Sequence, residues 1–264
     1  MLISLPMYGV QPQDVLPFGQ QLLYQLRRDG VTKTDEQLVW PSDLLQHWRD
    51  PKLLLSQTCG FPLVTLLQQH VQLVGVFSYQ SPYCSGAYYR SLVVVRDDEA
   101  GQELADFRHR RVAYNSIDSQ SGYNALRALI TPLAINGHFF SQSFASGSHS
   151  QSIEMIRRHQ ADIAAIDCVS FALLQRENPS AVTGLKIIAQ TQAVPGLPLI
   201  TSLLTSEEQL IRLRQAIRAT VEAPEARSAK DRLLINSFSE IPWSAYDAIR
   251  QMQATAFTSG VITL

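Results

Sequence analysis

Apolar positions along the chain follow two patterns that alternate. Short, nearly continuous apolar runs are typical of buried strands, and they occur at residues 2–5, 53–56, 73–79, 91–96, 111–115 and 162–166. Apolar residues at helical spacing, often framed by Ser, Asp or Gly, predict helices at residues 15–27, 43–48, 61–71, 121–135, 169–175, 205–221 and 242–257. Because strands and helices take turns, we predict an α/β fold with mostly parallel sheets flanked by helices.

Two turn-rich segments divide this pattern into lobes. The charged turn at residues 97–101 and the segment Pro195-Gly196-Leu197-Pro198 both interrupt the alternation. We therefore predict one lobe from residues 1–95 and 196–264 and a second lobe from residues 96–195. Two connecting segments would form the hinge between them, and the last predicted helix would dock on the first lobe.

Composition and charge narrow the classes of partner. The chain has 264 residues, of which 45% are hydrophobic and 17% charged, with a net charge of −1. This length and apolar content suffice for a sizeable core. The near-neutral charge and the lack of a basic cluster argue against nucleic acid as a partner, and no apolar run is long enough for direct membrane insertion.

The cysteines do not suggest a metal site. Cys59, Cys84 and Cys168 lack the spacing of zinc ligands, so we expect neither a metal nor a cofactor. A Cys59–Cys84 disulfide and two separate thiols are both compatible with the sequence.

Two Ser-Gly segments stand at predicted helix starts, Ser119-Gln120-Ser121-Gly122 and Ser146-Gly147-Ser148-His149. Helix starts present unpaired N–H groups and suit a phosphate-like anion. Simple N-capping is the alternative, since Ser148 with Gln151 satisfies a Ser-x-x-Gln capping box. In a parallel sheet the carboxyl ends of the strands meet at one edge, so Ser119, Ser121, Ser148 and Asp167 are expected to face one crevice.

These segments resemble a known family over most of the chain. The resemblance is carried by Ser4 to Tyr8, Ser56 to Gly60, Gly86 to Ser91, Asn115 to Tyr123 and Ser146 to Asp167. In these residues the sequence resembles the phosphate, phosphite and phosphonate substrate-binding proteins of ABC transporters. The resemblance implies a two-lobed type II periplasmic-binding-protein fold with a small phosphorus oxyanion or organophosphonate held in an interlobe cleft.

The resemblance also implies ligand contacts from neutral donors. The expected contacts in the second lobe are Ser119, Ser121, Gly122, Tyr123, Ser148 and His149. Asp167 is implied as the group that recognises the amine of an aminoalkyl phosphonate or a protonated phosphate. Two alternatives stay open, because His149 is equally an ordinary surface histidine and Asp167 equally a cap for the helix at residues 169–175.

A second set of contacts follows from the same resemblance, namely Tyr8, Gln57, Thr58 and Tyr89. The sequence departs from the family here, since Gln57-Thr58 stands where many phosphonate binders have an aromatic residue. Cys168 after Asp167 is a further departure. For Tyr89 the alternative is packing on a strand, where one of Tyr88 and Tyr89 points in and the other points out.

The expected function is capture of the anion for an ABC permease by a monomeric binding protein, without catalysis. Ser148 and His149 are sequence neighbours that point in different directions, and no Gly-x-Ser-x-Gly motif occurs. Two other classes share the fold: a cytoplasmic lyase of the menaquinone pathway acting on a carboxylated metabolite, and a stand-alone ligand sensor. The first residues lack the features of a signal peptide, which predicts a cytoplasmic protein if the sequence is complete and a periplasmic one if it is a mature form.

Overall fold

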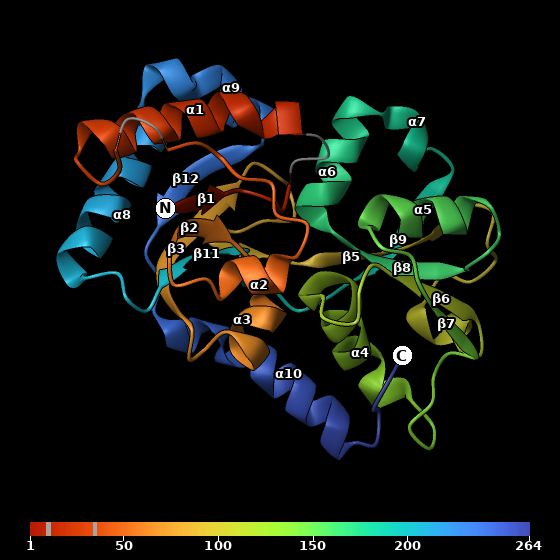
Figure 1. Ribbon diagram of the computed structural model, residues 1–264. Coiled ribbons are helices and arrows are strands. Elements are labelled where there is room, and N and C mark those ends of the chain that lie inside the picture. Colours follow the sequence, from red (N-terminus) through yellow and green to blue (C-terminus); the bar gives the residue numbers. More distant parts are fainter. Residues whose placement is uncertain (9–11, 34–35) are drawn as a thin grey trace. The chain divides into compact units, whose positions relative to one another are not determined.

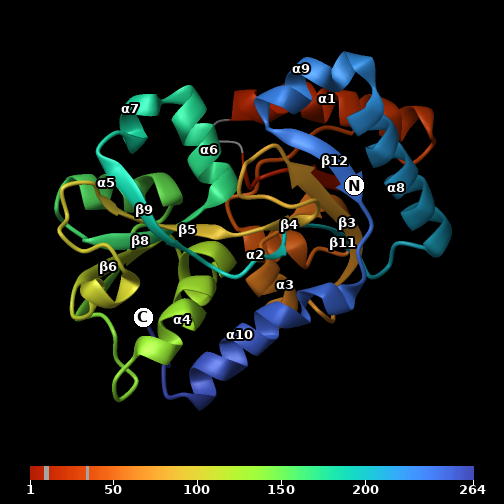
Figure 2. The ribbon, with the colours of Figure 1, turned by 180° about the vertical axis from the view of Figure 1, so that it is seen from behind.

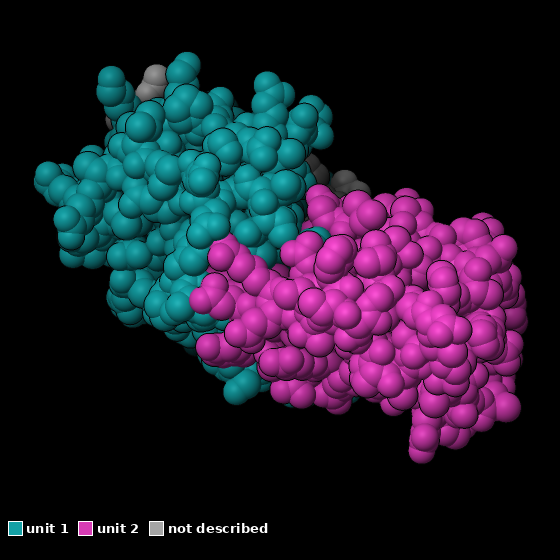
Figure 3. Space-filling view, turned by 90° about the horizontal axis from the view of Figure 1, so that it is seen from below, with its two compact units in different colours: residues 1–87, 195–245 teal, residues 88–194, 246–264 magenta. Residues whose placement is uncertain are grey.

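The computed structural model describes residues 1–8, 12–33 and 36–264, and the chain divides into two compact units. Unit 1 comprises residues 1–87 and 195–245, and unit 2 comprises residues 88–194 and 246–264 (Figure 3). The chain therefore passes from one unit to the other three times, where the sequence pattern predicts two passages. Residues 88–95 and 246–264 lie in unit 2, where the sequence places them in the first lobe.

Unit 1 is built on a five-stranded mixed sheet. Its strands are β1 (Leu2–Ser4), β2 (Leu53–Gln57), β3 (Val71–Tyr79), β11 (Pro198–Ser202) and β12 (Ile235–Ser239), in the order β1-β2-β11-β3-β12. β1 and β2 are parallel, whereas β11 is antiparallel to β2 and β3, and β12 is antiparallel to β3. The sheet is thus mixed and not mostly parallel, because the two strands from the later part of the chain run against the early ones.

Helices cover both faces of this sheet. On one side α1 (Pro12–Arg28) packs against α8 (Glu207–Glu222) and α9 (Arg227–Arg232); α2 (Leu44–Trp48) and α3 (Gly60–Leu66) lie on the other side (Figure 1). Two 3-10 turns, η4 (Pro224–Ala226) and η5 (Trp243–Tyr246), complete the helical elements. The apolar stripe of α1 includes Phe18, Leu22 and Leu26, all fully buried. Burying each such side chain contributes about 1.5–3 kcal/mol to the stability of the unit.

Two helix boundaries in unit 1 differ from the sequence expectation. The helix predicted to reach residue 71 ends at Leu66, because β3 already begins at Val71. The helix predicted from residue 205 begins at Glu207, because Ser206 is the cap of α8 and its hydroxyl accepts from the N–H of Gln209. The Thr205 hydroxyl bonds instead to that of Thr201.

Unit 2 has its own five-stranded mixed sheet. Its strands are β5 (Ser91–Arg96), β6 (Arg111–Tyr114), β7 (Gln142–Ala145), β8 (Ile163–Asp167) and β9 (Leu185–Gln190), in the order β7-β6-β8-β5-β9. β6 is parallel to β7 and β8, and β5 is antiparallel to β8 and β9. β5 is buried on both faces, which explains its continuous apolar sequence. Two short strands, β4 (Tyr88–Tyr89) and β10 (Val194–Pro195), form a separate ladder.

The helical elements of unit 2 include one π-helical turn. They are η1 (Leu104–Phe107), the π-turn η2 (Gln120–Asn124), α4 (Ala125–Ile130), η3 (Thr131–Leu133), α5 (His149–Arg157), α6 (Cys168–Glu177), α7 (Pro179–Val182) and α10 (Asp247–Thr258). The single helix predicted at residues 121–135 is therefore three successive elements of different helical type. α4 and α10 lie on one side of the sheet and α5 on the other (Figure 1, Figure 2).

The last helix packs within unit 2, contrary to the sequence expectation. α10 contacts α4 and η2, and both Ala256 and Val261 belong to the hydrophobic core that also contains Val93, Leu126 and Ile163. This apolar contact explains the third passage of the chain.

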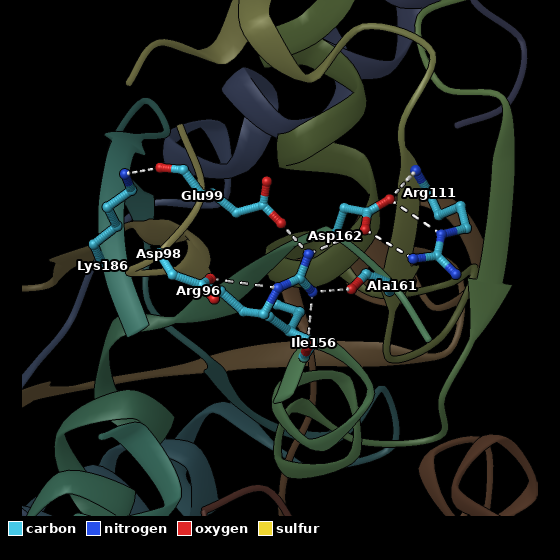
Figure 4. A network of polar contacts seen from close by, with 8 residues as sticks. All are labelled: Arg96, Asp98, Glu99, Arg111, Ile156, Ala161, Asp162 and Lys186. Carbon is cyan, nitrogen blue, oxygen red and sulfur yellow. Dashed lines mark hydrogen bonds and ion pairs between the residues drawn. The ribbon is translucent and has the colours of Figure 1, made fainter. Parts of the chain in front are cut away.

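A buried ion network ties together β5, β6 and the start of β8, the three central strands of the unit 2 sheet (Figure 4). The Asp162 carboxylate accepts from the backbone N–H of Arg111 at 3.0 Å and from its guanidinium at 2.9 and 3.1 Å. Arg96 pairs with Asp162 at 3.3 Å and also donates to the carbonyls of Ile156 and Ala161. Burial alone raises the pKa of Asp162, but the hydrogen bonds from Arg111 and Arg96 outweigh it and hold this pKa at about 2.

None of the three cysteines, which all lie in the described part of the chain, is in a disulfide. Within the same residues, no helix is long and apolar enough to cross a membrane. No group of three or more His, Cys, Asp or Glu side chains comes together there as metal ligands would.

Candidate functional site

The candidate site of unit 2 lies where its three parallel strands end. β6, β7 and β8 run in the same direction, so their carboxyl ends share one edge of the sheet. The Ser119 turn follows β6, Ser148 follows β7, and Asp167 is the last residue of β8. The parallel pairing thus brings together segments that the sequence spreads over about fifty residues.

The first segment is a serine-capped π-turn. Ser119 has an extended backbone, and its hydroxyl accepts from the N–H of Gly122 at 3.1 Å. The Ser121 side chain is buried, and its carbonyl accepts from the Ser91 hydroxyl at 2.8 Å. The capping alternative therefore applies to Ser119, while the hydroxyl of Ser121 does not cap the turn.

The second segment starts α5. The Ser148 hydroxyl accepts from the N–H of Gln151 at 3.2 Å, so Ser148 is also an N-cap. Gly147 before it has a φ of +94°, a conformation that glycine adopts without strain. Because Ser148 caps the helix, the next residue, His149, stands on its first turn.

The two segments meet through one hydrogen bond. Oγ of Ser121 lies 2.9 Å from Nε2 of His149, and Oγ of Ser119 lies 3.4 Å from Oγ of Ser121. His149 is half-buried. The imidazole is therefore part of the same polar cluster as the two serine hydroxyls and is not an ordinary surface histidine.

The charge state of this cluster is set by burial. Burial lowers the pKa of His149 to about 4, and the backbone of Ala165 offsets this only in part. The imidazole is consequently neutral near pH 7 and presents one N–H and one lone pair. Ser119, Ser121, Ser148 and His149 together offer hydroxyl and imidazole groups without a net charge.

Asp167 caps the helix that follows it. One carboxylate oxygen accepts from the N–H of Val169 at 2.7 Å and from that of Ser170 at 3.1 Å. Asp167 is only 2% exposed. The capping alternative thus applies, and contact between Asp167 and a ligand stays a prediction.

The two tyrosines expected in unit 2 are both buried. The Tyr123 ring packs edge to face on Tyr114, with centroids 4.9 Å apart, and the guanidinium of Arg127 lies over it. Tyr89 is 3% exposed and Tyr88 is 41% exposed. This is the in-and-out arrangement of a strand that the sequence allowed as the alternative for Tyr89.

Sequence reasoning missed Asn115, which contacts the site from the end of β6. A Cβ placed on Gly122 would lie 2.0 Å from Oδ1 of Asn115 and 3.3 Å from Cε1 of His149. Gly122 therefore allows Asn115 and His149 to approach the π-turn. The buried Oδ1 of Asn115 has no hydrogen-bond partner among the described residues. The only available signal was an amide side chain directly after a strand.

A model of the family described as "ABC transporter, phosphonate, periplasmic substrate-binding protein" matches residues 42–246. The chain belongs to this family. No curated protein matches the chain. The resemblance seen in the sequence is thereby confirmed, and the family is one of transport binding proteins from the periplasm.

Several solved structures share the fold of this chain. A binding protein component of an ABC phosphonate transporter from Pseudomonas aeruginosa has a TM-score of 0.78 at 16% identity, over 98% of this chain and 87% of its own. PhnD1 from Prochlorococcus marinus, in complex with methylphosphonate, has a TM-score of 0.76 at 15% identity, over 96% and 97%. XAC2383 from Xanthomonas citri, bound to ATP, has a TM-score of 0.75 at 14% identity, over 98% of both chains. The expected type II periplasmic-binding-protein fold is confirmed.

Two of the site residues expected in unit 1, Tyr8 and Gln57, both contact Tyr79. Nε2 of Gln57 donates to the Tyr79 hydroxyl at 2.9 Å, and the Tyr8 ring packs edge to face on Tyr79 with centroids 4.9 Å apart. Tyr8, Gln57 and Tyr79 line a small cavity with Val15. Thr58 is fully buried. Ligand contact by Tyr8, Gln57 and Thr58 stays a prediction from the resemblance.

Proposed function

We propose that this protein captures a small phosphorus oxyanion or organophosphonate and that the Ser121–His149 pair contacts the oxyanion. The observation that carries the proposal is the 2.9 Å contact between Oγ of Ser121 and Nε2 of His149. It gathers two polar side chains from different helix starts at the shared carboxyl edge of β6, β7 and β8. Such convergence of polar groups at a sheet edge is typical of ligand sites in α/β proteins.

Neutral donors suit this class of ligand. An oxyanion that leaves water must recover hydrogen bonds from the protein, and bonds to a charged acceptor are stronger than neutral ones. The hydroxyls of Ser119, Ser121 and Ser148 and the imidazole of His149 supply such bonds. None of these four residues carries a charge near pH 7, so the ligand keeps its own charge when bound.

The relatives support a phosphorus-containing ligand. PhnD1 from Prochlorococcus marinus is in complex with methylphosphonate, and XAC2383 from Xanthomonas citri is bound to ATP. Both ligands present tetrahedral phosphorus with several oxygens. We propose the same group for the present chain, held by the described cluster in unit 2 with Gly122 and Tyr123 as neighbours.

Asp167 selects the rest of the ligand in this proposal. A carboxylate close to an oxyanion repels it unless the ligand also carries a cation or a protonated oxygen. We propose an aminoalkyl phosphonate as the preferred ligand within the class.

The partner and the compartment follow the family. We propose that the protein works in the periplasm as a monomer and delivers its ligand unchanged to an ABC permease. The family is described as periplasmic and as part of an ABC transporter. Cell fractionation and copurification with a permease test both parts.

Titration calorimetry on refolded, ligand-free protein tests the function. The panel consists of phosphate, phosphite, methylphosphonate and 2-aminoethylphosphonate. We expect binding at micromolar concentration or below, and Ser121→Ala is expected to weaken it by about 1.5–3 kcal/mol, the value of a hydrogen bond to a charged group. Ser206→Ala is the control, because the Ser206 hydroxyl caps α8 in unit 1 and loss of a cap lowers stability by about 1 kcal/mol without a comparable loss of affinity.

Failure of all four compounds to bind would contradict the proposal. Turnover of a carboxylated metabolite by the same preparation would then favour a lyase, and binding that requires a second protein would favour a sensor.

A further inference from the structure

A buried polar cluster lies behind the Ser119 turn and connects it to the C-terminal segment, residues 246–264. Its members are Gln120 and Asn124 of the π-turn and Arg127 of α4, which are 0%, 0% and 7% exposed. All of these residues, and the whole C-terminal segment, belong to unit 2. Polar side chains buried to this degree destabilise a fold unless they are hydrogen-bonded.

Asn124 makes the central contacts of the cluster. Its Nδ2 donates to Oε1 of Gln120 at 2.8 Å and lies 3.3 Å from the carbonyl of Ile249 in α10. Nε2 of Gln120 donates to Sδ of Met252, also in α10, at 3.4 Å. The π-turn is thus hydrogen-bonded to α10 through two different side chains.

Arg127 extends the same connection to the end of the chain. Its Nη2 donates to Oδ1 of Asn124 at 3.1 Å, and its Nη1 donates to the carbonyl of Ile262 at 2.8 Å. The guanidinium also lies over the Tyr123 ring, 5.5 Å from the centroid. Every polar atom of the Asn124 amide therefore has a partner in the cluster.

The π-turn needs such support because its geometry is uncommon. The N–H of Asn124 bonds to the carbonyl of Ser119 at 3.0 Å, the wider spacing of a π-helix. π-turns are rare in proteins and often occur at functional sites. In this chain the turn carries Ser119 and Ser121, so its backbone shape decides where their hydroxyls lie.

We propose that residues 246–264 are a positioning element for the candidate site and that Asn124 is the positioning residue through which they hold the π-turn in shape. The part of this inference that concerns ligand affinity rests on the function proposed above. The part that concerns the shape of the turn is independent of any ligand. The contacts that hold α10 against the π-turn are also the contacts that keep residues 119–125 ordered.

Hydrogen exchange of the full-length, ligand-free protein tests the coupling. Asn124→Ala is expected to speed exchange at least tenfold in residues 119–125 and in α10, and to leave β6 and β8 unchanged. Thr131→Val is the control, since the Thr131 hydroxyl donates to the carbonyl of Arg127 at 2.8 Å and this bond does not reach residues 246–264. Equal exchange in Asn124→Ala and Thr131→Val would overturn the inference.

A second variant covers the case in which Asn124→Ala does not fold. Met252→Leu keeps the apolar volume in α10 and removes only the acceptor of the Gln120 amide. It is expected to speed exchange in the π-turn by a smaller factor, although the substitution lies more than a hundred residues away in the sequence. No change in the π-turn of a folded Met252→Leu protein would again overturn the inference.

Affinity for methylphosphonate separates positioning from general stability. Asn124→Ala is expected to raise the dissociation constant about tenfold, and Thr131→Val is expected to leave it within a factor of two. Faster exchange with unchanged affinity would overturn the role in binding. Faster exchange in Asn124→Ala, combined with a wild type that binds none of the panel, would support the coupling and reject the proposed function.

Discussion

The hydroxyl oxygen of Ser121 lies 2.9 Å from Nε2 of His149, although the two residues are 28 positions apart in the sequence. This contact joins the turn after β6 to the first turn of α5. It makes His149 a member of a polar cluster. The Ser121 hydroxyl thereby has a side-chain partner, whereas the Ser119 hydroxyl accepts from the N–H of Gly122 as an N-cap.

Replacement of His149 by Asn tests its buried neutral state. The folded pKa of about 4 lies below the ordinary value of 6.5, so the unfolded chain binds more protons between these values. Stability is therefore complete above about pH 6.5 and falls as the pH is lowered toward 4. The wild type is expected to lose roughly 2–3 kcal/mol more than His149→Asn over this range.

Urea denaturation at pH 7, 5.5 and 4.5 measures this difference. Burial also lowers the pKa of His47, with Asp50 opposing the shift. The stability of both proteins therefore still declines as the pH falls, by a smaller amount. Asp162 loses its contribution only below its ordinary pKa, as the pH falls toward 2, and does not disturb the comparison. Parallel stability curves for the two proteins would show that His149 is not held neutral.

Gly122→Ala is expected to disturb the site by steric overlap. The added Cβ would lie 2.0 Å from Oδ1 and 3.0 Å from Cγ of Asn115, so the Asn115 side chain must move. We expect a loss of about 1–3 kcal/mol in stability, as for other over-packed positions. Binding of methylphosphonate should weaken more than tenfold, measured by calorimetry.

The double variant Asn115→Ala/Gly122→Ala distinguishes the clash from a general effect of the substitution. Shortening residue 115 removes the atoms that the new Cβ would meet. Stability should recover by at least half in thermal denaturation. A double variant that is less stable than Gly122→Ala alone would show that Asn115 does not cause the strain.

Asp167→Asn separates capping from ligand selection. Asn and Asp are similarly good N-caps, so the stability of the protein should change by less than about 1 kcal/mol. If the carboxylate pairs with a ligand amine, 2-aminoethylphosphonate should lose about 1.5–3 kcal/mol of affinity while methylphosphonate loses none. Equal effects on the two ligands in calorimetry would leave Asp167 as a cap only.

Asp162→Asn should strongly destabilise unit 2. The substitution leaves Arg96 and Arg111 without their shared carboxylate, and breaking one partner of a buried ion pair typically costs about 3–5 kcal/mol. Glu154→Gln is the matched control, because the Glu154–Arg158 pair is exposed and a pair of this kind contributes less than about 1 kcal/mol. Guanidinium denaturation compares the two, and similar losses would mean that the network of Figure 4 is not a major source of stability.

The secondary structure was largely predictable where its signal is local. The apolar runs at residues 53–56, 73–79 and 91–96 match β2, β3 and β5 closely. Four strands of the two main sheets, β7, β9, β11 and β12, were not predicted. For β7 the reason is that the sequence Gln142-Ser-Phe-Ala145 is mostly exposed and has no apolar pattern. The π-turn was read as part of a longer α-helix, since side-chain periodicity over five residues does not separate the two helical types.

The candidate site was predictable only in part. Ser119, Ser148 and Asp167 are helix caps, and their residue types at strand ends already mark the edge where they lie. Asn115 gave no comparable signal, because its importance depends on a contact with Gly122 that forms only in the folded chain. Ligand contact by any of these residues stays a prediction.

By itself the sequence determined the alternating elements, the caps and the family, because periodicity, capping and motifs depend on residues close together in the chain. Only the tertiary structure decided the antiparallel course of β11 and β12, the packing of α10 on α4 and the meeting of Ser121 with His149. These features are set by pairing and burial between distant segments. Many alternative pairings satisfy the same local pattern, and the burial of apolar surface and of polar groups with partners selects among them.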